Sequence, residues 1–239
     1  MNLPGQNQKT DSRALQIPLD LGFRSAMGRA DFLIGESNAA AVGWIDRWPE
    51  WPAPILVLQG PPASGKTHLC AVWSAVSKAV FIKPDRLLGE NADTLFESGP
   101  ALILDGLDPW IGDRDAETAL FHLYNLLREE RSTMLITMRT APKALEFSLP
   151  DLASRFRAAP VATIQPPDDL LLSALLIKQF SDRQIRVGED VISYILPRME
   201  RSFAAAREIV ALADHMALAE KSRISVPLMR RVLSQLHTQ

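Results

Sequence analysis

The stretch GPPASGKT, from Gly60 to Thr67, matches the phosphate-loop pattern G-x-x-x-x-G-K-[ST]. Its small residues let backbone N–H groups close around phosphates, while Lys66 can reach the outer phosphates and Thr67 can hold Mg²⁺. A chance glycine turn is the alternative, but the apolar run ILVLQ precedes the stretch and the helix-like HLCAVWSAV follows it. We therefore predict a nucleotide site with Mg²⁺. The residues expected to contact the nucleotide are Gly60, Pro62, Ala63, Ser64, Gly65, Lys66, Thr67 and His68.

A second chemical signal is the apolar run ALILD, which ends in Asp105. An aspartate at the carboxyl end of a strand beside a phosphate loop can hold the hydration shell of Mg²⁺, although it can also merely cap a turn. Many ATPases place a second carboxylate directly afterwards to orient the attacking water, but this chain has Gly106 there. Asp108 follows in a loop that need not deliver it to the water. We therefore expect hydrolysis by the chain alone to be slow or absent.

The elements that must position these residues alternate along the chain. The apolar runs PILVLQG, AVFIK, ALILDG, STMLITM and PVATIQP have the continuous character of strands buried on both faces. Helical periodicity lies between them, as in DAETALFHLYNLLREER. This alternation predicts an α/β domain around a parallel sheet, spanning residues 25–167. After Pro166 and Pro167 the patterns are all helical, which predicts a small helical domain over residues 168–239.

The N-terminal segment, residues 1–24, combines a polar lead with one apolar stretch. The lead MNLPGQNQKTDSR has the composition of a disordered segment, whereas LQIPLDLGF places large apolar residues in an otherwise polar tail. Pro18 and Gly22 disfavour a helix there. The stretch therefore either packs on its own domain or is presented to a partner.

Composition sets the outer bounds of function. The chain has 239 residues, 47% of them hydrophobic, with a net charge of −2, so no polybasic face predicts general attraction to nucleic acid. A single cysteine, Cys70, excludes an internal disulfide and fits a reducing compartment. For Cys70 and His68, packing or a polar surface position is the simpler interpretation. No signal peptide or membrane-spanning run is found, and we expect a cytoplasmic protein with no membrane partner.

Several motifs together resemble a known family. In order they are ADFLIGESN, GPPASGKT, LILDGLD, FHLYNLL, LITMRTAP and LPDLASRFR, followed by a helical lid. This series is similar to the AAA+ core of the bacterial replication initiator DnaA, and closer still to the Hda group of shorter DnaA relatives. The resemblance covers about residues 13 to 236. It implies a AAA+ core with a five-stranded parallel sheet and an all-helical lid.

The resemblance also implies a function and partners. Hda-like proteins bind ADP or ATP, attach to the β sliding clamp, and make DnaA-bound ATP hydrolyse after replication has begun, so they inhibit further initiation. Their short clamp-binding peptide corresponds here to Gln16, Ile17, Leu19 and Leu21. An extended peptide with one polar anchor and a few apolar side chains suits a groove, and a proline reduces its ordering cost. Self-packing of the stretch remains the alternative.

The resemblance also implies that Arg155, in the motif LPDLASRFR, is an arginine finger that acts in trans. Such a finger stabilises charge developing on the γ-phosphate of a partner's ATP. Without the resemblance, a surface or salt-bridging arginine would be the simpler interpretation. Arg157 is the nearby competitor, and we expect Arg155 to lie on the surface.

The sequence departs from the family pattern in two places. DnaA relatives end the fourth strand with a small residue and an aspartate before arginine, whereas this chain has Thr137, Met138 and Arg139, so Thr137 is only a candidate sensor. The lid normally supplies an arginine to the phosphates, but Ala204 stands at that position. We select Arg207 over Arg201 as the replacement. Both departures favour a site that holds a ligand and sets a conformation over one that turns it over.

Three classes of function follow from these features. The first is a regulatory adaptor whose Arg155 acts on a partner's ATP. The second is a self-contained ATPase or loading factor, which would need a water-positioning carboxylate at residue 106. The third is a DNA-binding initiator, but the sequence ends at Gln239 just after the lid, so we expect no direct sequence-specific DNA binding. The sequence leaves open the resting nucleotide and whether the chain forms a homodimer.

Overall fold

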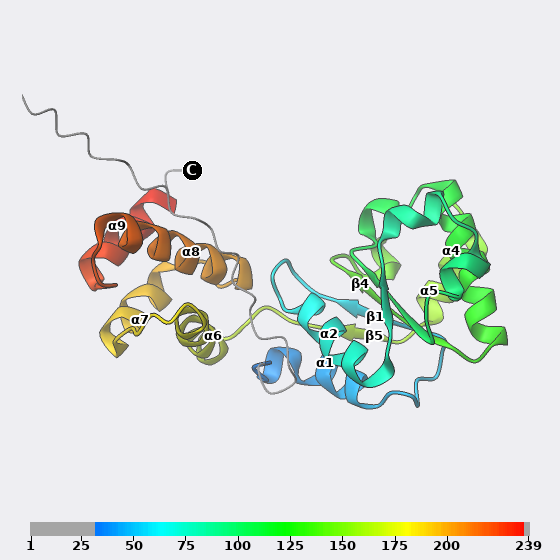
Figure 1. Cartoon of the computed structure of the whole chain (residues 1–239), viewed down its shortest axis with the longest axis horizontal. Coiled ribbons are helices and arrows are strands. Elements are labelled where there is room, and N and C mark those ends of the chain that lie inside the picture. The colour runs from blue at the N-terminus through cyan, green and yellow to red at the C-terminus, as the bar shows by residue number, and fades with distance from the viewer. Residues whose placement is uncertain (1–31, 237–239) are drawn as a thin grey trace, which may run out of the picture.

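The computed structural model describes residues 32–236 and divides them into an α/β core and a helical lid (Figure 1). The core contains α1 (Glu36–Asp46), β1 (Ile55–Gln59), α2 (Lys66–Ser77), β2 (Val80–Ile82), α3 (Ala92–Phe96), β3 (Ala101–Asp105), α4 (Arg114–Glu129), β4 (Thr133–Met138), α5 (Pro150–Ala158) and β5 (Val161–Thr163). The lid contains α6 (Asp169–Asp182), α7 (Glu189–Ile195), α8 (Phe203–Glu220) and α9 (Val226–Leu236). Short 3₁₀ turns occur at Pro84–Leu88, Asp108–Trp110, Pro142–Ala144 and Leu196–Arg198.

The strands form a five-stranded parallel sheet in the order β2-β3-β4-β1-β5. Alternate residues of each central strand point to opposite faces of the sheet and pack in the hydrophobic cluster on that face. In β1, Ile55 and Val57 pack with α3, α4 and α5 on one face, while Leu56 and Leu58 pack with α1 and α2 on the other. Because helices cover both faces, the strands read as continuous apolar runs in the sequence. The predicted α/β fold, with a five-stranded parallel sheet followed by a helical lid, is confirmed.

The register of the sheet brings the polar strand ends together. β4 lies between β1 and β3, with Thr137 opposite Leu58 on one side and Asp105 on the other. The phosphate loop begins directly after β1. In a parallel sheet the carboxyl ends of all strands meet at one edge, where ligands of open α/β sheets bind. Residues distant in the sequence therefore converge at this edge.

The lid packs around a separate apolar core and also touches the α/β core. Its interior is formed by side chains such as Leu176, Phe180 and Val210. Leu171 of α6 and Phe203 of α8 belong instead to the cluster that lies over α1 and α2. Within residues 32–236, no helix is both long and apolar enough to cross a membrane.

Candidate nucleotide site at the core and lid

Gly65 sets the geometry of the phosphate loop. It is the N-cap of α2 and has φ of +88°, in the left-handed region that favours glycine. A Cβ on Gly65 would lie 2.9 Å from Cε2 of Phe32. Backbone conformation and space therefore both require glycine where the loop turns into the helix. The helix N-terminus that follows directs unpaired N–H groups and a positive dipole toward the loop, which suits a phosphate.

The polar side chains of the strand ends form one hydrogen-bonded network. The Thr67 hydroxyl donates to Oδ2 of Asp105 at 2.8 Å, and the Thr137 hydroxyl donates to Oδ1 of the same carboxylate at 2.5 Å. Thr137 is fully buried and also accepts the N–H of Gly106 at 2.8 Å. This arrangement orients Asp105 toward Thr67. Together these two residues present oxygen ligands of the kind that Mg²⁺ prefers.

Lys66 lies at the centre of the phosphate loop. Its ammonium donates to the carbonyl oxygens of Gly60 and Pro61, both at 2.8 Å. Burial lowers the pKa of Lys66 from its usual value, and the nearby positive charge of Arg139 lowers it further, against the opposing effect of Asp105. Two cations thus border the same space, and a phosphate bound there would favour the charged form of Lys66.

Neither Gly106 nor Asp108, the residues that follow β3, provides a base to activate a water molecule. Gly106 has φ of +85° and has no side chain. The carboxylate of Asp108 accepts the N–H groups of Arg139 and Thr140 at 2.8 to 3.0 Å, which fixes it at the end of β4. These hydrogen bonds hold the Asp108 carboxylate in a structural role. Met138, where the family pattern has an aspartate, is fully buried in the core.

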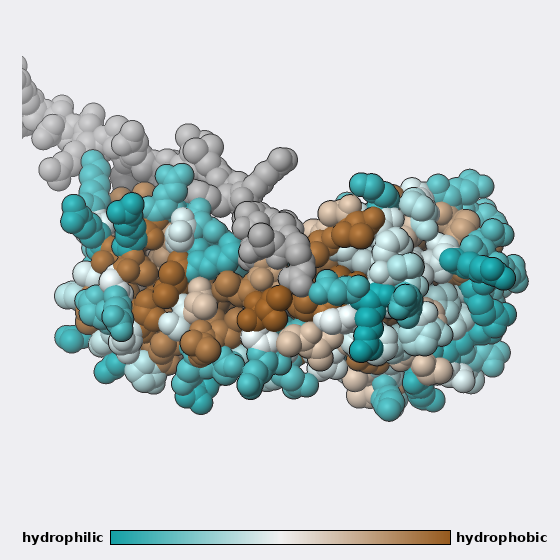
Figure 2. Space-filling view, turned by 90° about the horizontal axis from the view of Figure 1, so that it is seen from below, coloured by the Kyte–Doolittle hydropathy of each residue, from teal (hydrophilic) through white to brown (hydrophobic). Residues whose placement is uncertain are grey.

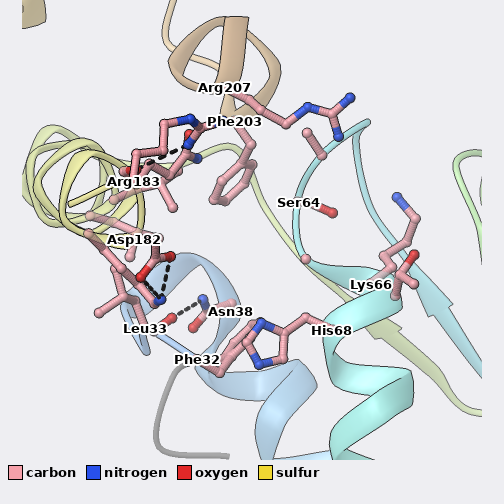
Figure 3. Close-up of a pocket in the computed structure, with 17 residues that line it drawn as sticks. Phe32, Leu33, Asn38, Ser64, Lys66, His68, Asp182, Arg183, Phe203 and Arg207 are labelled. Carbon is pink, nitrogen blue, oxygen red and sulfur yellow. Dashed lines mark hydrogen bonds and ion pairs between the residues drawn. The ribbon is translucent and has the colours of Figure 1, made fainter. Parts of the chain in front are cut away.

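A cavity of about 470 Å³ lies between the phosphate loop, the start of α1 and the lid (Figure 3). Its apolar lining comes from Phe32, Leu33, Leu171, Leu175 and Phe203. Its polar lining includes Asn38, Ser64, Lys66, Thr67, His68, Lys178, Gln179, Asp182, Arg183 and Arg207. An apolar slot bordered by a phosphate loop is the arrangement that a flat base and its phosphates require.

A neighbouring hollow of about 550 Å³ extends from the phosphate loop to the strand ends. Lys66, Thr67, Asp105 and Thr137 line it, and Arg139 borders it as well. This is where the outer phosphates and a metal ion would meet the groups described above. Except for Gly60, every core residue predicted to contact the nucleotide lines one of the two spaces. At Gly60, a Cβ would lie 3.0 Å from both Ile164 and Ser64, so glycine permits close packing beneath the loop.

The lid arginines differ in their surroundings. Arg207 lines both spaces and points across the cavity toward the phosphate loop (Figure 3). Ala204 lines only the second space, and its methyl group supplies no charge. Arg201 forms an exposed ion pair with Asp169 at 2.9 Å. The positions of these side chains therefore favour Arg207 as the lid residue that would meet a phosphate.

Comparisons with known proteins agree with this architecture. Domain III of DnaA from Thermotoga maritima superposes with a TM-score of 0.74 at 18% identity, over 87% of this chain and 96% of that one. DnaA from Aquifex aeolicus bound to AMPPCP gives 0.62 at 20% identity, over 77% and 63%. The RuvB branch migration motor of Thermotoga maritima gives 0.59 at 16% identity, over 77% and 62%. At these identities the likeness establishes the fold.

A family comparison adds information about the lid. Residues 169–233 match the family described as the lid domain of Hda. The helical lid of this chain therefore matches the Hda lid domain, and the chain as a whole has the fold of DnaA domain III. The resemblance to Hda seen in the sequence is thereby supported over the lid, and the resemblance to DnaA is supported at the level of the fold. The Hda lid begins at α6, whose first turn is capped by the side chain of Asp168 accepting the N–H of Leu171 at 2.7 Å.

Arg155 lies on α5, on the face of the sheet opposite α1 and the Hda lid. Leu152 and Phe156 of the same helix pack into the core beneath α4. Arg155 lines neither of the two nucleotide spaces. Arg155 is half-buried, so the expectation that it lies on the surface is only partly met. Arg157, by contrast, is exposed. The reason is the aromatic surface of α4, against which the Arg155 guanidinium lies.

Some parts of the site were missed by sequence reasoning, and one predicted site lies outside the described residues. Phe32, Leu33 and Asn38 come from the stretch ADFLIGESN, which supported the resemblance but was given no role. The polar residues of α6 at the cavity belong to no motif. Gln16, Ile17, Leu19 and Leu21, the predicted clamp-binding residues, precede residue 32 and lie outside the described residues.

Proposed function

We propose that this chain regulates the initiation of DNA replication by stimulating hydrolysis of ATP bound to DnaA. The observation that carries the proposal is the position of Arg155, which lines neither of the chain's own nucleotide spaces. An arginine in that position can serve a nucleotide only on another molecule. In such a role it would stabilise the charge that develops on the γ-phosphate, an effect worth about 10³ to 10⁵ in rate.

The proposal includes an adenine nucleotide in the cavity of this chain. Supporting it are the phosphate loop, the apolar slot beside it and the binding of AMPPCP by the Aquifex aeolicus relative. Lys66 and Arg207 would contact the phosphates, and Thr67 with Asp105 would hold Mg²⁺. The metal would neutralise phosphate charge. We expect the nucleotide to organise the lid against the core, with little turnover because Gly106 supplies no carboxylate and Asp108 is held by backbone N–H groups.

A third part of the proposal is attachment to the β sliding clamp through Gln16, Ile17, Leu19 and Leu21. Its support is the sequence of the stretch LQIPLDLGF and the Hda lid that accompanies it. The clamp would bring the regulator to DnaA at replicating DNA. This part can fail without affecting the role of Arg155, because the two features use different regions of the chain.

The deciding experiment is single-turnover hydrolysis of labelled ATP on DnaA with clamp present. We expect Arg155→Ala to lower the stimulated rate by two or more powers of ten, while Arg157→Ala, at an exposed neighbour, behaves like the parent chain. Arg155→Lys should restore little, because an ammonium cannot reproduce the planar guanidinium. ADP binding should be unchanged in all three variants. Full stimulation by Arg155→Ala would refute the finger.

The same preparation tests the competing function of a self-contained ATPase. A steady rate near ~1 s⁻¹ by this chain alone, typical of phosphoryl-transfer enzymes, would favour that alternative. We expect a far lower rate, since no described side chain at the strand ends is placed to activate water.

A further inference from the structure

The inner face of α4 meets the helix that carries Arg155. Glu117, Phe121 and Tyr124 are spaced along α4 at steps of four and three residues, so they share one face. The Glu117 carboxylate, which is fully buried, accepts the N–H groups of Ser148 and Leu149 at 3.1 and 2.7 Å. These donors immediately precede α5. Glu117 therefore fixes the start of α5, and the two aromatic residues lie further along, opposite its last turn.

Two aromatic rings hold the guanidinium of Arg155. Its central carbon lies 4.9 Å from the ring centroid of Phe121 and 4.9 Å from that of Tyr124. Both distances are within the range of cation–π attraction. The Nε atom of Arg155 is buried without a hydrogen-bond partner. Across residues 32–236, no carboxylate forms an ion pair with Arg155.

This mode of support differs from an ion pair in one respect that matters for chemistry. A carboxylate partner would orient the guanidinium but would also neutralise it and occupy its donors. Aromatic faces attract the cation through their quadrupoles and leave its net charge and its terminal N–H groups available. A finger needs that charge in the partner's transition state, where electrostatic stabilisation has its largest effect.

We propose that Tyr124, together with Phe121, is a positioning residue that holds Arg155 in its active orientation without neutralising it. The inference rests on the proposed role of Arg155 as a trans-acting finger. Tyr124 is 9% exposed, so its ring acts mainly through Arg155 and the core rather than through direct contact with a partner. Loss of the ring should therefore reduce the rate of the stimulated reaction more than the strength of association.

The chain provides a matched control for this contact. In the lid, Arg198 lies 4.2 Å from the ring centroid of Tyr194, which is the same type of pair at a distance from α5. Tyr194→Leu removes an aromatic face from an arginine just as Tyr124→Leu does. Tyr124→Phe keeps the face and loses only the hydroxyl.

The test measures stimulated hydrolysis of DnaA-bound ATP at increasing concentrations of this chain. For Tyr124→Leu we expect the maximal rate to fall about tenfold, the size of a partly desolvated cation–π contact, with the half-saturating concentration unchanged. Tyr124→Phe and Tyr194→Leu should match the parent chain. Because Tyr124→Leu can also disturb the core, Phe121→Leu at the partly buried second ring provides an independent variant with the same expected loss of maximal rate.

The outcomes separate this inference from the proposed function. If Arg155→Ala loses stimulation while Tyr124→Leu and Phe121→Leu keep it, the finger stands and the positioning role is wrong. If Tyr124→Leu does not fold, full stimulation by Phe121→Leu equally rules out the positioning role. If Tyr124→Phe falls as far as Tyr124→Leu, the hydroxyl rather than the ring is responsible, and the inference also fails. If Arg155→Ala stimulates fully, the proposed function itself is refuted.

Discussion

At the scale of single residues, Gly106 combines two properties at one position. It stands where many ATPases carry a water-orienting carboxylate, and its φ of +85° lies in the left-handed region. A Cβ there would meet no atom within 4 Å, so space does not exclude a side chain. The backbone disfavours one, because an L-residue in this conformation is strained. A glutamate at this position would therefore introduce backbone strain in the chain after β3.

This reasoning predicts the effect of Gly106→Ala on stability. We expect a loss of about 1–2 kcal/mol in the free energy of unfolding, since only backbone strain is introduced. Gly89→Ala is the matched control, because Gly89 also has open space around it but has φ of −110°. That substitution should be neutral or slightly stabilising. Denaturant unfolding measures both, and an equal effect of the two substitutions would contradict the argument.

At the scale of elements, α2 joins the phosphate loop to the buried face of the sheet. Its first turn carries Lys66 and Thr67 toward the cavity, while Cys70 one turn later is fully buried against the strands. Burial raises the pKa of the Cys70 thiol well above its usual value, and the nearby charge of Asp105 raises it further. The thiolate, which is the reactive form, is thus disfavoured in the folded protein.

Cys70 therefore reports on the opening of α2. In the native protein, we expect an aromatic disulfide reagent at neutral pH to modify Cys70 only as fast as α2 opens or the core unfolds. Added ADP with Mg²⁺ should slow the reaction further, because a ligand that binds only the folded state stabilises it. Absorbance of the released thiolate follows the reaction. Modification at the rate of a free cysteine would contradict the buried position.

The same elements show how far the sequence can predict this structure. The strands could be predicted because helices cover both faces of the sheet, which imposes continuous apolar runs such as ILVLQ. Lys66, Thr67 and Asp105 could be assigned because phosphate and metal chemistry restricts their residue types. Phe32 and Gln179 could not, because an apolar wall or a polar rim accepts many residue types. The cation–π support of Arg155 also has no motif, since it joins side chains of different helices.

At the scale of the whole molecule, the cavity lies where two separately packed units meet. Leu171 and Phe203 of the lid pack in the cluster of the α/β core and also line the cavity. In Figure 2, apolar residues cover part of the surface from the lid to the region where the lid meets the α/β core. Ile34 and Leu170, next to the start of α1 and of α6, remain exposed. A nucleotide between the units would contact both and couple their stabilities.

The proposed attachment to the β sliding clamp also concerns the whole molecule, because it would join this chain to a partner through residues other than those of the nucleotide site. We expect Gln16→Ala with Leu19→Ala to abolish binding to the clamp and to leave the melting temperature nearly unchanged, because these residues supply the polar anchor and an apolar contact. Leu3→Ala with Gln6→Ala changes the same residue types outside the motif and should bind like the parent chain. Surface plasmon resonance on immobilised clamp measures the affinity. A large drop in melting temperature would instead indicate packing on the chain's own core.

The location of α5 on the opposite side of the sheet from the cavity has a consequence for symmetry. A surface that offers Arg155 and a pocket that could receive such a residue are different patches of the same chain. Contacts that join two different patches are heterologous, so the subunits of such a complex are arranged head to tail. A complex built through α5 therefore has two unlike ends, one with an unused finger and one with an unfilled receiving site. Whether further AAA+ subunits can join the complex would depend on which of the two ends they can bind.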